Sequence, residues 1–219
     1  MKVSLKWKYN VLKAKPVLFQ SEWTTPEMME RLIADIQKTG RVVELAIIDE
    51  MENGWTVKEF LKWKEEIEEE PSNIVVYFDG GFDLQTKRAG IGVVIYYQQH
   101  NATYRIRINH LFNELCSNSE AEYVALYFAC QQLEDLGAHH VPCMIKGDAQ
   151  GVIMQLLGEW PCYEEILNDW LNKIEDKLKM LGIKATYETI SRKQNKEADQ
   201  LASQALHDQM IHSHVKIEN

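Results

Sequence analysis

The 219-residue sequence contains no long apolar run, and its N-terminus lacks the hydrophobic segment of a signal peptide. A membrane-spanning helix needs about 20 mainly apolar residues, so we expect a soluble, cytoplasmic protein without membrane contacts. The four cysteines show no C-x-x-C spacing, and their apolar surroundings predict reduced core residues. His207, His212 and His214 have no partner at ligand spacing, so we interpret them as tail residues rather than a zinc site.

Positive charge is also scarce, because 24 lysines and arginines face 33 acids and leave a formal net charge of -9. An acidic chain of this kind is not a general polyanion binder, so any contact with nucleic acid requires a local basic patch or bridging cations. The first fifteen residues hold five lysines and no acid, interleaved with Trp7 and Tyr9. Together with Trp23, these aromatic residues could stack on bases. The alternative is a solvated lysine face that protects an edge strand from aggregation.

Hydrophobic periodicity divides the chain into two parts. Residues 1–67 show the alternation and helix-capping signals of a small α+β unit with the order ββαβα, which can serve nucleic-acid or partner binding. A glutamate-rich segment ended by proline predicts a linker at 68–73. Residues 74–208 have the order βββαβααβα, which predicts a mixed sheet flanked by helices, and 209–219 are expected to form a frayed tail.

Four acids of the second part attract attention, and each has an ordinary structural explanation. Asp79 ends the apolar strand 74–79 and can open a turn there. Glu122 completes a capping box with Ser119. Asp148 can cap a helix, and Asp199 can be a solvated helix position.

Taken together, the four acids favour a metal site. Three of them lie where open α/β sheets place ligands, beyond the carboxyl ends of strands or on the first turn of a neighbouring helix. Carboxylates about 4 Å apart repel by roughly 4 kcal/mol per pair near a protein surface, so such a cluster requires cations. Oxygen ligands suit Mg²⁺ or Mn²⁺, and two such ions clamp the attacking water and the leaving oxygen of a phosphodiester.

Four segments, in the same order, resemble the four motifs of type 1 ribonuclease H, and the resemblance covers about residues 74–207. These segments are Phe78-Asp79-Gly80-Gly81, Ser117-Asn118-Ser119-Glu120-Ala121-Glu122-Tyr123, Lys146-Gly147-Asp148-Ala149-Gln150 and Asn195-Lys196-Glu197-Ala198-Asp199-Gln200-Leu201-Ala202.

The resemblance implies a ribonuclease H-like mixed five-stranded sheet and endonucleolytic, metal-dependent hydrolysis of the RNA strand of RNA–DNA hybrids. It implies that Asp79, Glu122, Asp148 and Asp199 are catalytic and hold two Mg²⁺ or Mn²⁺ ions. No Ser–His or Cys–His pair is needed for this chemistry. The resemblance also implies substrate contacts, which read the RNA 2′-hydroxyl and the DNA strand. The residues concerned are Gly80, Gly81, Ser117, Asn118, Ser119 and Asn195.

The sequence departs from many members of this family at three places. The loop 191–196 contains Arg192 but no histidine, as in the subgroup that shares its Asn-Lys-Glu-Ala-Asp motif, and residues 158–161 replace a lysine-rich protrusion. The N-terminal unit does not match the family's familiar hybrid-binding module. An alternative is therefore a weakly active or inactive module that binds nucleic acid or a protein partner. A DEDD-type exonuclease is disfavoured, because Asp79-Gly80-Gly81 lacks the glutamate of an Asp-x-Glu motif.

Overall fold

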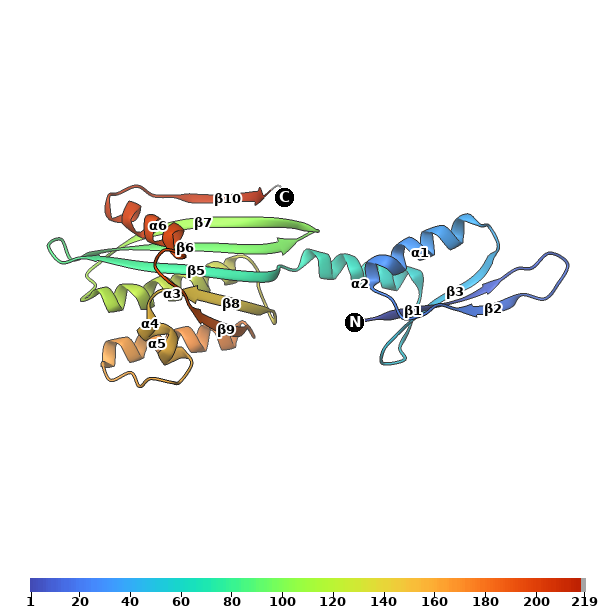
Figure 1. Ribbon diagram of the computed structural model, residues 1–219, viewed down its shortest axis with the longest axis horizontal. Helices are drawn as coiled ribbons and strands as arrows, with labels where there is room; N and C mark the ends of the chain where they lie inside the picture. Colours follow the sequence, from blue (N-terminus) through green and yellow to red (C-terminus); the bar gives the residue numbers. More distant parts are fainter. Residues whose placement is uncertain (218–219) are drawn as a thin grey trace. The chain divides into compact units, whose positions relative to one another are not determined.

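The computed structural model describes residues 1–217, and the chain divides into two compact units, Met1–Glu69 and Glu70–Asn219 (Figure 1). No helix in the described part is long and apolar enough to cross a membrane. The division falls between the end of one helix and the start of the next strand, within the segment where the sequence predicts a linker.

The N-terminal unit is a four-stranded antiparallel sheet with strand order β2-β1-β3-β4, packed against two helices. Both helices cover the same face, because Met29 of one and Phe60 of the other join the core cluster that contains Val3 and Leu5. A short strand that the sequence does not predict makes the order ββαββα. The elements are β1 (Val3–Tyr9), β2 (Val17–Gln20), α1 (Pro26–Lys38), β3 (Val42–Asp49), β4 (Gly54–Trp55) and α2 (Val57–Glu69).

The second unit is a mixed sheet with strand order β10-β7-β6-β5-β8-β9. Strands β5, β6 and β7 form an antiparallel meander, β8 and β9 add in parallel beside β5, and β10 pairs antiparallel with β7. The elements are β5 (Ser72–Asp83), β6 (Arg88–Gln99), β7 (Ala102–Asn113), α3 (Asn118–Asp135), β8 (Pro142–Gly147), α4 (Gln150–Leu156), α5 (Glu165–Met180), β9 (Lys184–Thr189), α6 (Lys196–Leu206) and β10 (His212–Ile217).

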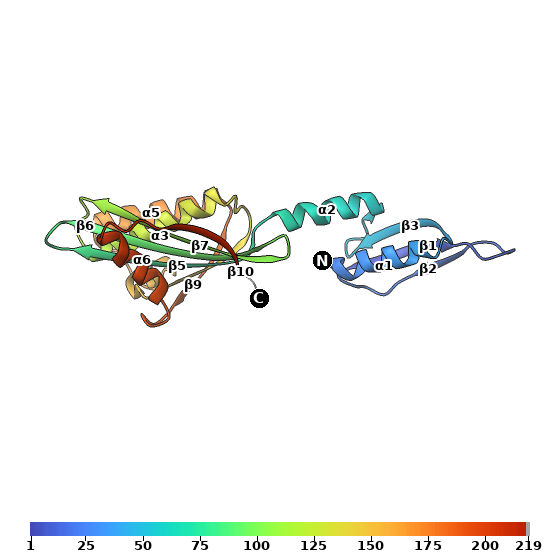
Figure 2. The ribbon, with the colours of Figure 1, turned by 90° about the horizontal axis from the view of Figure 1, so that it is seen from above.

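Helices cover both faces of this sheet (Figure 2). On β6, Val93 faces the large core that α3, α4 and α5 share, whereas the next residue, Val94, packs against Ala198 and Leu201 of α6. This one-residue alternation places α6 on the opposite face from α3. The acids of α3 and α6 therefore approach the sheet from opposite sides.

The predicted five strands and frayed tail are both wrong, because residues 212–217 form a sixth strand. Strand β10 pairs with β7 from His212↔Ile108 to Ile217↔Thr103. The His214 ring packs against Tyr97 and Tyr104, and its Nε2 lies 2.6 Å from the Tyr97 hydroxyl. These aromatic contacts anchor a segment that is too polar to stand out as a strand. Residues 218–219 of the predicted tail lie outside the described residues.

The cysteines only partly follow the prediction. Cys130 and Cys143 are buried in the core, whereas Cys116 is exposed and Cys162 is half-buried. None of the four forms a disulfide within the described part of the chain. The core interpretation of Cys116 was therefore wrong, because its segment precedes α3 as a surface loop.

Two glycines of β6 let α6 lie directly on the sheet. A Cβ atom on Gly92 would stand 2.2 Å from the carbonyl oxygen of Ala198, and one on Gly90 would stand 2.1 Å from that of Ala202. Real Cβ atoms do not come this close to backbone atoms, so only glycine permits this packing. The Gly90-Ile91-Gly92 pattern thus sets the distance between the sheet and the helix that carries Asp199.

The substitution Gly92→Ala should lower the free energy of unfolding by about 1–3 kcal/mol, because α6 must move away from β6 to admit the methyl group. The urea midpoint, followed by circular dichroism, measures this effect. Gly151→Ala is the matched control, since a Cβ there meets nothing within 4 Å. An unchanged midpoint for Gly92→Ala would show that α6 does not pack as closely as described.

Candidate active site

Asp79 lies inside β5 and not at its end as predicted, because the strand continues to Asp83 in its hairpin with β6. The parallel partner β8 accompanies β5 only to the pair Tyr77↔Lys146. Asp79 therefore stands just beyond the carboxyl end of β8, where one side of β5 becomes free. Asp79 is nevertheless buried, with only 7% of its surface exposed. Its carboxylate is therefore poorly solvated.

Glu122 of α3 faces the same point of β5. Its Oε2 accepts a hydrogen bond from the backbone N–H of Gly80 at 3.1 Å. A Cβ on Gly80 would stand 2.4 Å from the carbonyl carbon of Ala121, so glycine is required for the helix to approach. Gly80 therefore sets how closely α3 can approach β5.

The capping box that could explain Glu122 structurally uses other residues. Ser117 is the N-cap, and its hydroxyl accepts from the N–H of Glu120 at 3.1 Å. Glu120 in turn accepts from the Cys116 N–H at 2.7 Å and from the Trp170 indole at 3.2 Å. The capping box thus lies two residues earlier than the predicted one, and Glu122 is not used for capping.

Asp148 follows β8 and does not cap α4 either, since the N-cap position is Ala149 and has no side-chain cap. Its Oδ1 instead accepts from the Asn195 Nδ2 at 2.6 Å. The same amide nitrogen donates to the Phe78 carbonyl oxygen at 2.9 Å and lies 3.4 Å from the Asp79 Oδ1. Asn195 therefore ties Asp148 to the strand that carries Asp79.

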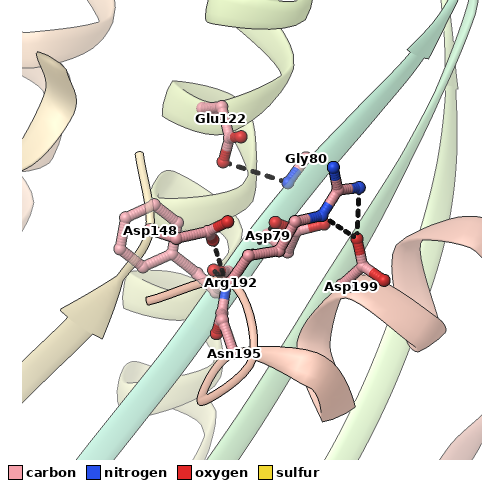
Figure 3. A network of polar contacts seen from close by, with 8 residues as sticks. Asp79, Gly80, Glu122, Asp148, Arg192, Asn195 and Asp199 are labelled. Carbon is pink, nitrogen blue, oxygen red and sulfur yellow. Dashed lines mark hydrogen bonds and ion pairs between the residues drawn. The ribbon is translucent and has the colours of Figure 1, made fainter. Parts of the chain in front are cut away.

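Asp199 lies on the first turn of α6 and is paired with an arginine (Figure 3). Its Oδ1 accepts from the Arg192 Nε at 3.1 Å and from its NH2 group at 2.7 Å. The Arg192 side chain is 80% exposed. Arg192 belongs to the loop in which many type 1 ribonucleases H have a histidine, and it brings a positive charge to the acids.

All four predicted acids line one cavity at this edge of the sheet (Figure 3). Of the predicted substrate contacts, Gly80, Gly81 and Asn118 also line it, whereas Ser119 is exposed beside it on α3. Ser117 is occupied as the N-cap, and Asn195 is 1% exposed beneath the acids. Direct substrate contact by these six residues stays a prediction.

The acids perturb one another electrostatically. Burial, reinforced by the charges of Asp148 and Asp199, raises the pKa of Asp79 to about 7. Burial, together with the charges of Asp79 and Asp148, raises the pKa of Glu122 to about 9. The hydrogen bond to Asp199 raises the pKa of Arg192, so the guanidinium stays charged. Arg192 is the one cation beside four acids among the described residues that line the cavity, so the site is short of positive charge.

This deficit and the all-oxygen donor set fit divalent metal ions such as Mg²⁺ or Mn²⁺. Within residues 1–217, no three carboxylates, histidines or cysteines are grouped closely enough to ligate one ion as they stand. Arg192 and Asn195 occupy oxygen atoms of Asp199 and Asp148 that an ion would use. The residues fit the metal chemistry, and Arg192 competes with an ion for the Oδ1 atom of Asp199.

The raised pKa values predict a pH-dependent stability for the metal-free protein. Since both folded pKa values lie above those of unfolded acids, the folded state binds more protons, and its stability falls as pH rises from about 4 to about 9. Asp79→Asn should therefore stabilise the metal-free protein at pH 8 by on the order of 2–4 kcal/mol. Urea unfolding in EDTA at pH 5 and pH 8 measures this effect. Asp176→Asn on exposed α5 is the control, and an equal change in both variants would contradict the prediction.

Removing the arginine should favour metal binding. Arg192→Ala leaves Asp199 without its cation, so Mn²⁺ should bind about twofold to fivefold more tightly, as expected for an exposed ion pair. Calorimetric titration without nucleic acid measures the dissociation constant. Lys193→Ala removes a neighbouring positive charge without removing the ion pair and should have a smaller effect. Weaker binding by Arg192→Ala would mean that the pair holds Asp199 ready for the ion.

The sequence profile of the Reverse transcriptase-like family matches residues 77–205, which contain all four acids. The chain is 43% identical over 200 residues to the uncharacterized protein YpeP of Bacillus subtilis (strain 168), and the alignment covers 91% of this chain and 88% of YpeP. That coverage extends into the N-terminal unit. YpeP therefore resembles both units and not the second alone.

Solved structures resemble the second unit. The ribonuclease H1 of Halobacterium salinarum NRC-1 is 26% identical with a TM-score of 0.53, covering 62% of this chain and 98% of that protein. LC11-RNase H1, solved in complex with an RNA/DNA hybrid, is 24% identical with a TM-score of 0.55 and the same coverages. Both are type 1 enzymes by name, and they share the fold of residues beyond the linker. With a profile match over more than half of its length, the chain belongs to the ribonuclease H-like family described as Reverse transcriptase-like.

Proposed function

We propose that this chain is an endonuclease that hydrolyses the RNA strand of RNA–DNA hybrids. In this proposal, Asp79, Glu122, Asp148 and Asp199 hold two Mg²⁺ or Mn²⁺ ions. The observation that carries the proposal is the cavity at the edge of the sheet, which is lined by one acid from each of four separate segments of the chain. Neither Glu122 nor Asp148 caps its helix, because Ser117 caps α3 and the N-cap position of α4 is Ala149.

When bound, two such ions activate water and stabilise the charge that develops on the phosphate. The chain contributes the positions of the ligands. Glu122 is held against β5 by the Gly80 N–H, and Asp148 is held by the Asn195 amide. Asp199 stands opposite on α6, next to Arg192. The ligands therefore come from both faces of the sheet, and a phosphate can approach between them from the open side of the cavity.

Selectivity for RNA would come from contacts to the 2′-hydroxyl. The backbone at Gly80 and Gly81 and the Glu122 carboxylate lie beside the other three acids and are suited to such a contact. Asn118, at the start of α3, lines the same cavity, and in this proposal it contacts the minor groove. Few lysines surround the cavity, so the affinity for a hybrid should depend on a small number of phosphate contacts.

A second candidate function is a module that binds nucleic acid or a protein partner without cleaving it. The observation in its favour is the pair between Arg192 and Asp199, which occupies a proposed ligand. Tight binding of a hybrid without turnover in Mg²⁺ or Mn²⁺ would favour this candidate. Turnover in either metal would exclude it.

Asp148→Asn should lower the rate of hybrid cleavage by roughly 10²-fold or more, because it removes one negative oxygen from the ion-binding set. The assay follows cleavage of a hybrid with labelled RNA in Mg²⁺ and in Mn²⁺. Both ends of the RNA are blocked, so that only internal cleavage is detected. Asp176→Asn, an exposed acid on α5 outside the cavity, should cleave like the wild type. No cleavage by the wild type in either metal would overturn the proposal.

A further inference from the structure

The hairpin formed by β1 and β2 carries a cluster of aromatic side chains that the N-terminal core buries only in part. Trp7 stands opposite Phe19 in the strand register, and their rings stack with centroids 5.5 Å apart and planes at 20°. Tyr9 meets the edge of Phe19 at 6.1 Å. Phe19 is 45% exposed, and Trp7 and Tyr9 are each partly exposed. We call Trp7, Tyr9 and Phe19 the aromatic cluster.

The aromatic cluster lies on the part of the sheet face that α1 and α2 no longer cover. Val3 and Leu5 occupy the same face of β1 and are fully buried under α1 and α2, whereas burial falls along Trp7 and Tyr9. The hairpin extends past the end of α1 (Figures 1 and 2). The rings therefore continue the core face beyond the helices as a partly exposed stacking platform, and Phe19 is the most exposed of the three.

Positive charge surrounds this platform. The Arg41 guanidinium lies 5.9 Å from the Tyr9 ring centroid, and its NH1 group donates to the Tyr9 hydroxyl at 3.2 Å. Lys13 and Lys15 are exposed in the turn that joins the two strands. No acid occurs in residues 1–21, and the nearby Glu44 is paired with Lys8. The chain as a whole has a net charge of -9, whereas this hairpin is positively charged.

We infer that the β1–β2 hairpin binds single-stranded nucleic acid. Exposed aromatic rings beside cations match its chemistry, because unpaired bases stack on the rings while phosphates contact Lys13, Lys15 and Arg41. A duplex keeps its base faces stacked internally and cannot use the rings. In the proposed nuclease, such a surface would hold the single-stranded segment that flanks a hybrid. The binding itself does not depend on hydrolysis.

The charge contribution is tested by fluorescence anisotropy with a labelled 20-nucleotide oligothymidine in EDTA and 50 mM NaCl. The double variant Lys13→Glu and Lys15→Glu should bind about tenfold or more weakly and reduce the salt dependence, since each phosphate contact contributes a slope of about 0.7 for single strands. The control, Lys179→Glu with Lys184→Glu, changes the net charge equally on exposed positions of the second unit. Equal weakening in both double variants would overturn the inference.

Stacking is tested separately. Phe19→Leu keeps an apolar side chain but removes a ring, and it should weaken oligothymidine binding about fivefold or more, the range expected for loss of one base–aromatic contact. Binding should also quench tryptophan fluorescence, and Trp7→Phe should remove most of the quench while preserving affinity within about threefold. Far-ultraviolet circular dichroism checks that both variants are folded. A quench that persists in Trp7→Phe would overturn this location of the site.

The outcomes separate this inference from the proposed nuclease. Because the assay contains EDTA and a DNA that is not a hybrid, a catalytically dead protein gives the same result. If the protein does not bind oligothymidine at 50 mM NaCl, the inference is overturned, even if hybrids are cleaved. The aromatic cluster would then be a surface for a protein partner. Binding without hybrid cleavage supports the inference and removes only the nuclease proposal.

Discussion

Repulsion among four carboxylates is the constraint on which the second unit depends. Two of them, Asp79 and Glu122, are poorly solvated enough for their pKa values to rise to about 7 and about 9. A fold that brings them together must offset this cost through packing elsewhere. The close approaches at Gly80 and Gly92 provide that packing, since they press α3 and α6 onto opposite faces of the sheet. The acids converge because the backbones around them cannot separate without opening the core.

Polar contacts then divide the site into two parts. On one side, Glu122 and Asp148 are held by the Gly80 N–H and the buried Asn195 amide. The Asn195 amide is fixed in orientation, since its nitrogen faces two carboxylates, while its buried oxygen has no hydrogen-bond partner among residues 1–217. On the other side, the Asp199 carboxylate is held by the exposed Arg192. The site thus combines a firmly packed half with a half whose partner can leave into solvent.

The sequence allowed the family resemblance, the order of the elements and the four acids to be predicted. Local patterns could not decide among the structural explanations, because Ser119–Glu122 and Ser117–Glu120 both satisfy the capping pattern and only the tertiary contacts of Glu120 with Trp170 select the second. The importance of Gly90 and Gly92 was missed for a similar reason, since their need for glycine arises from a helix more than 100 residues later. Phe19 was likewise missed among the aromatic residues of the N-terminal unit, although it completes the ring stack with Trp7.

The sixth strand has a consequence for the boundary of the folded unit. Strand β10 shields the outer rim of the twelve-residue strand β7, and its His214 closes over Tyr97 and Tyr104. A version of the chain that ends after α6 would expose this edge of β7 and the rings of Tyr97 and Tyr104. Unpaired strand rims recruit other strands, so such a shortened version would self-associate. Strand β10 thereby replaces the long edge of β7 with the edge of a shorter, six-residue strand.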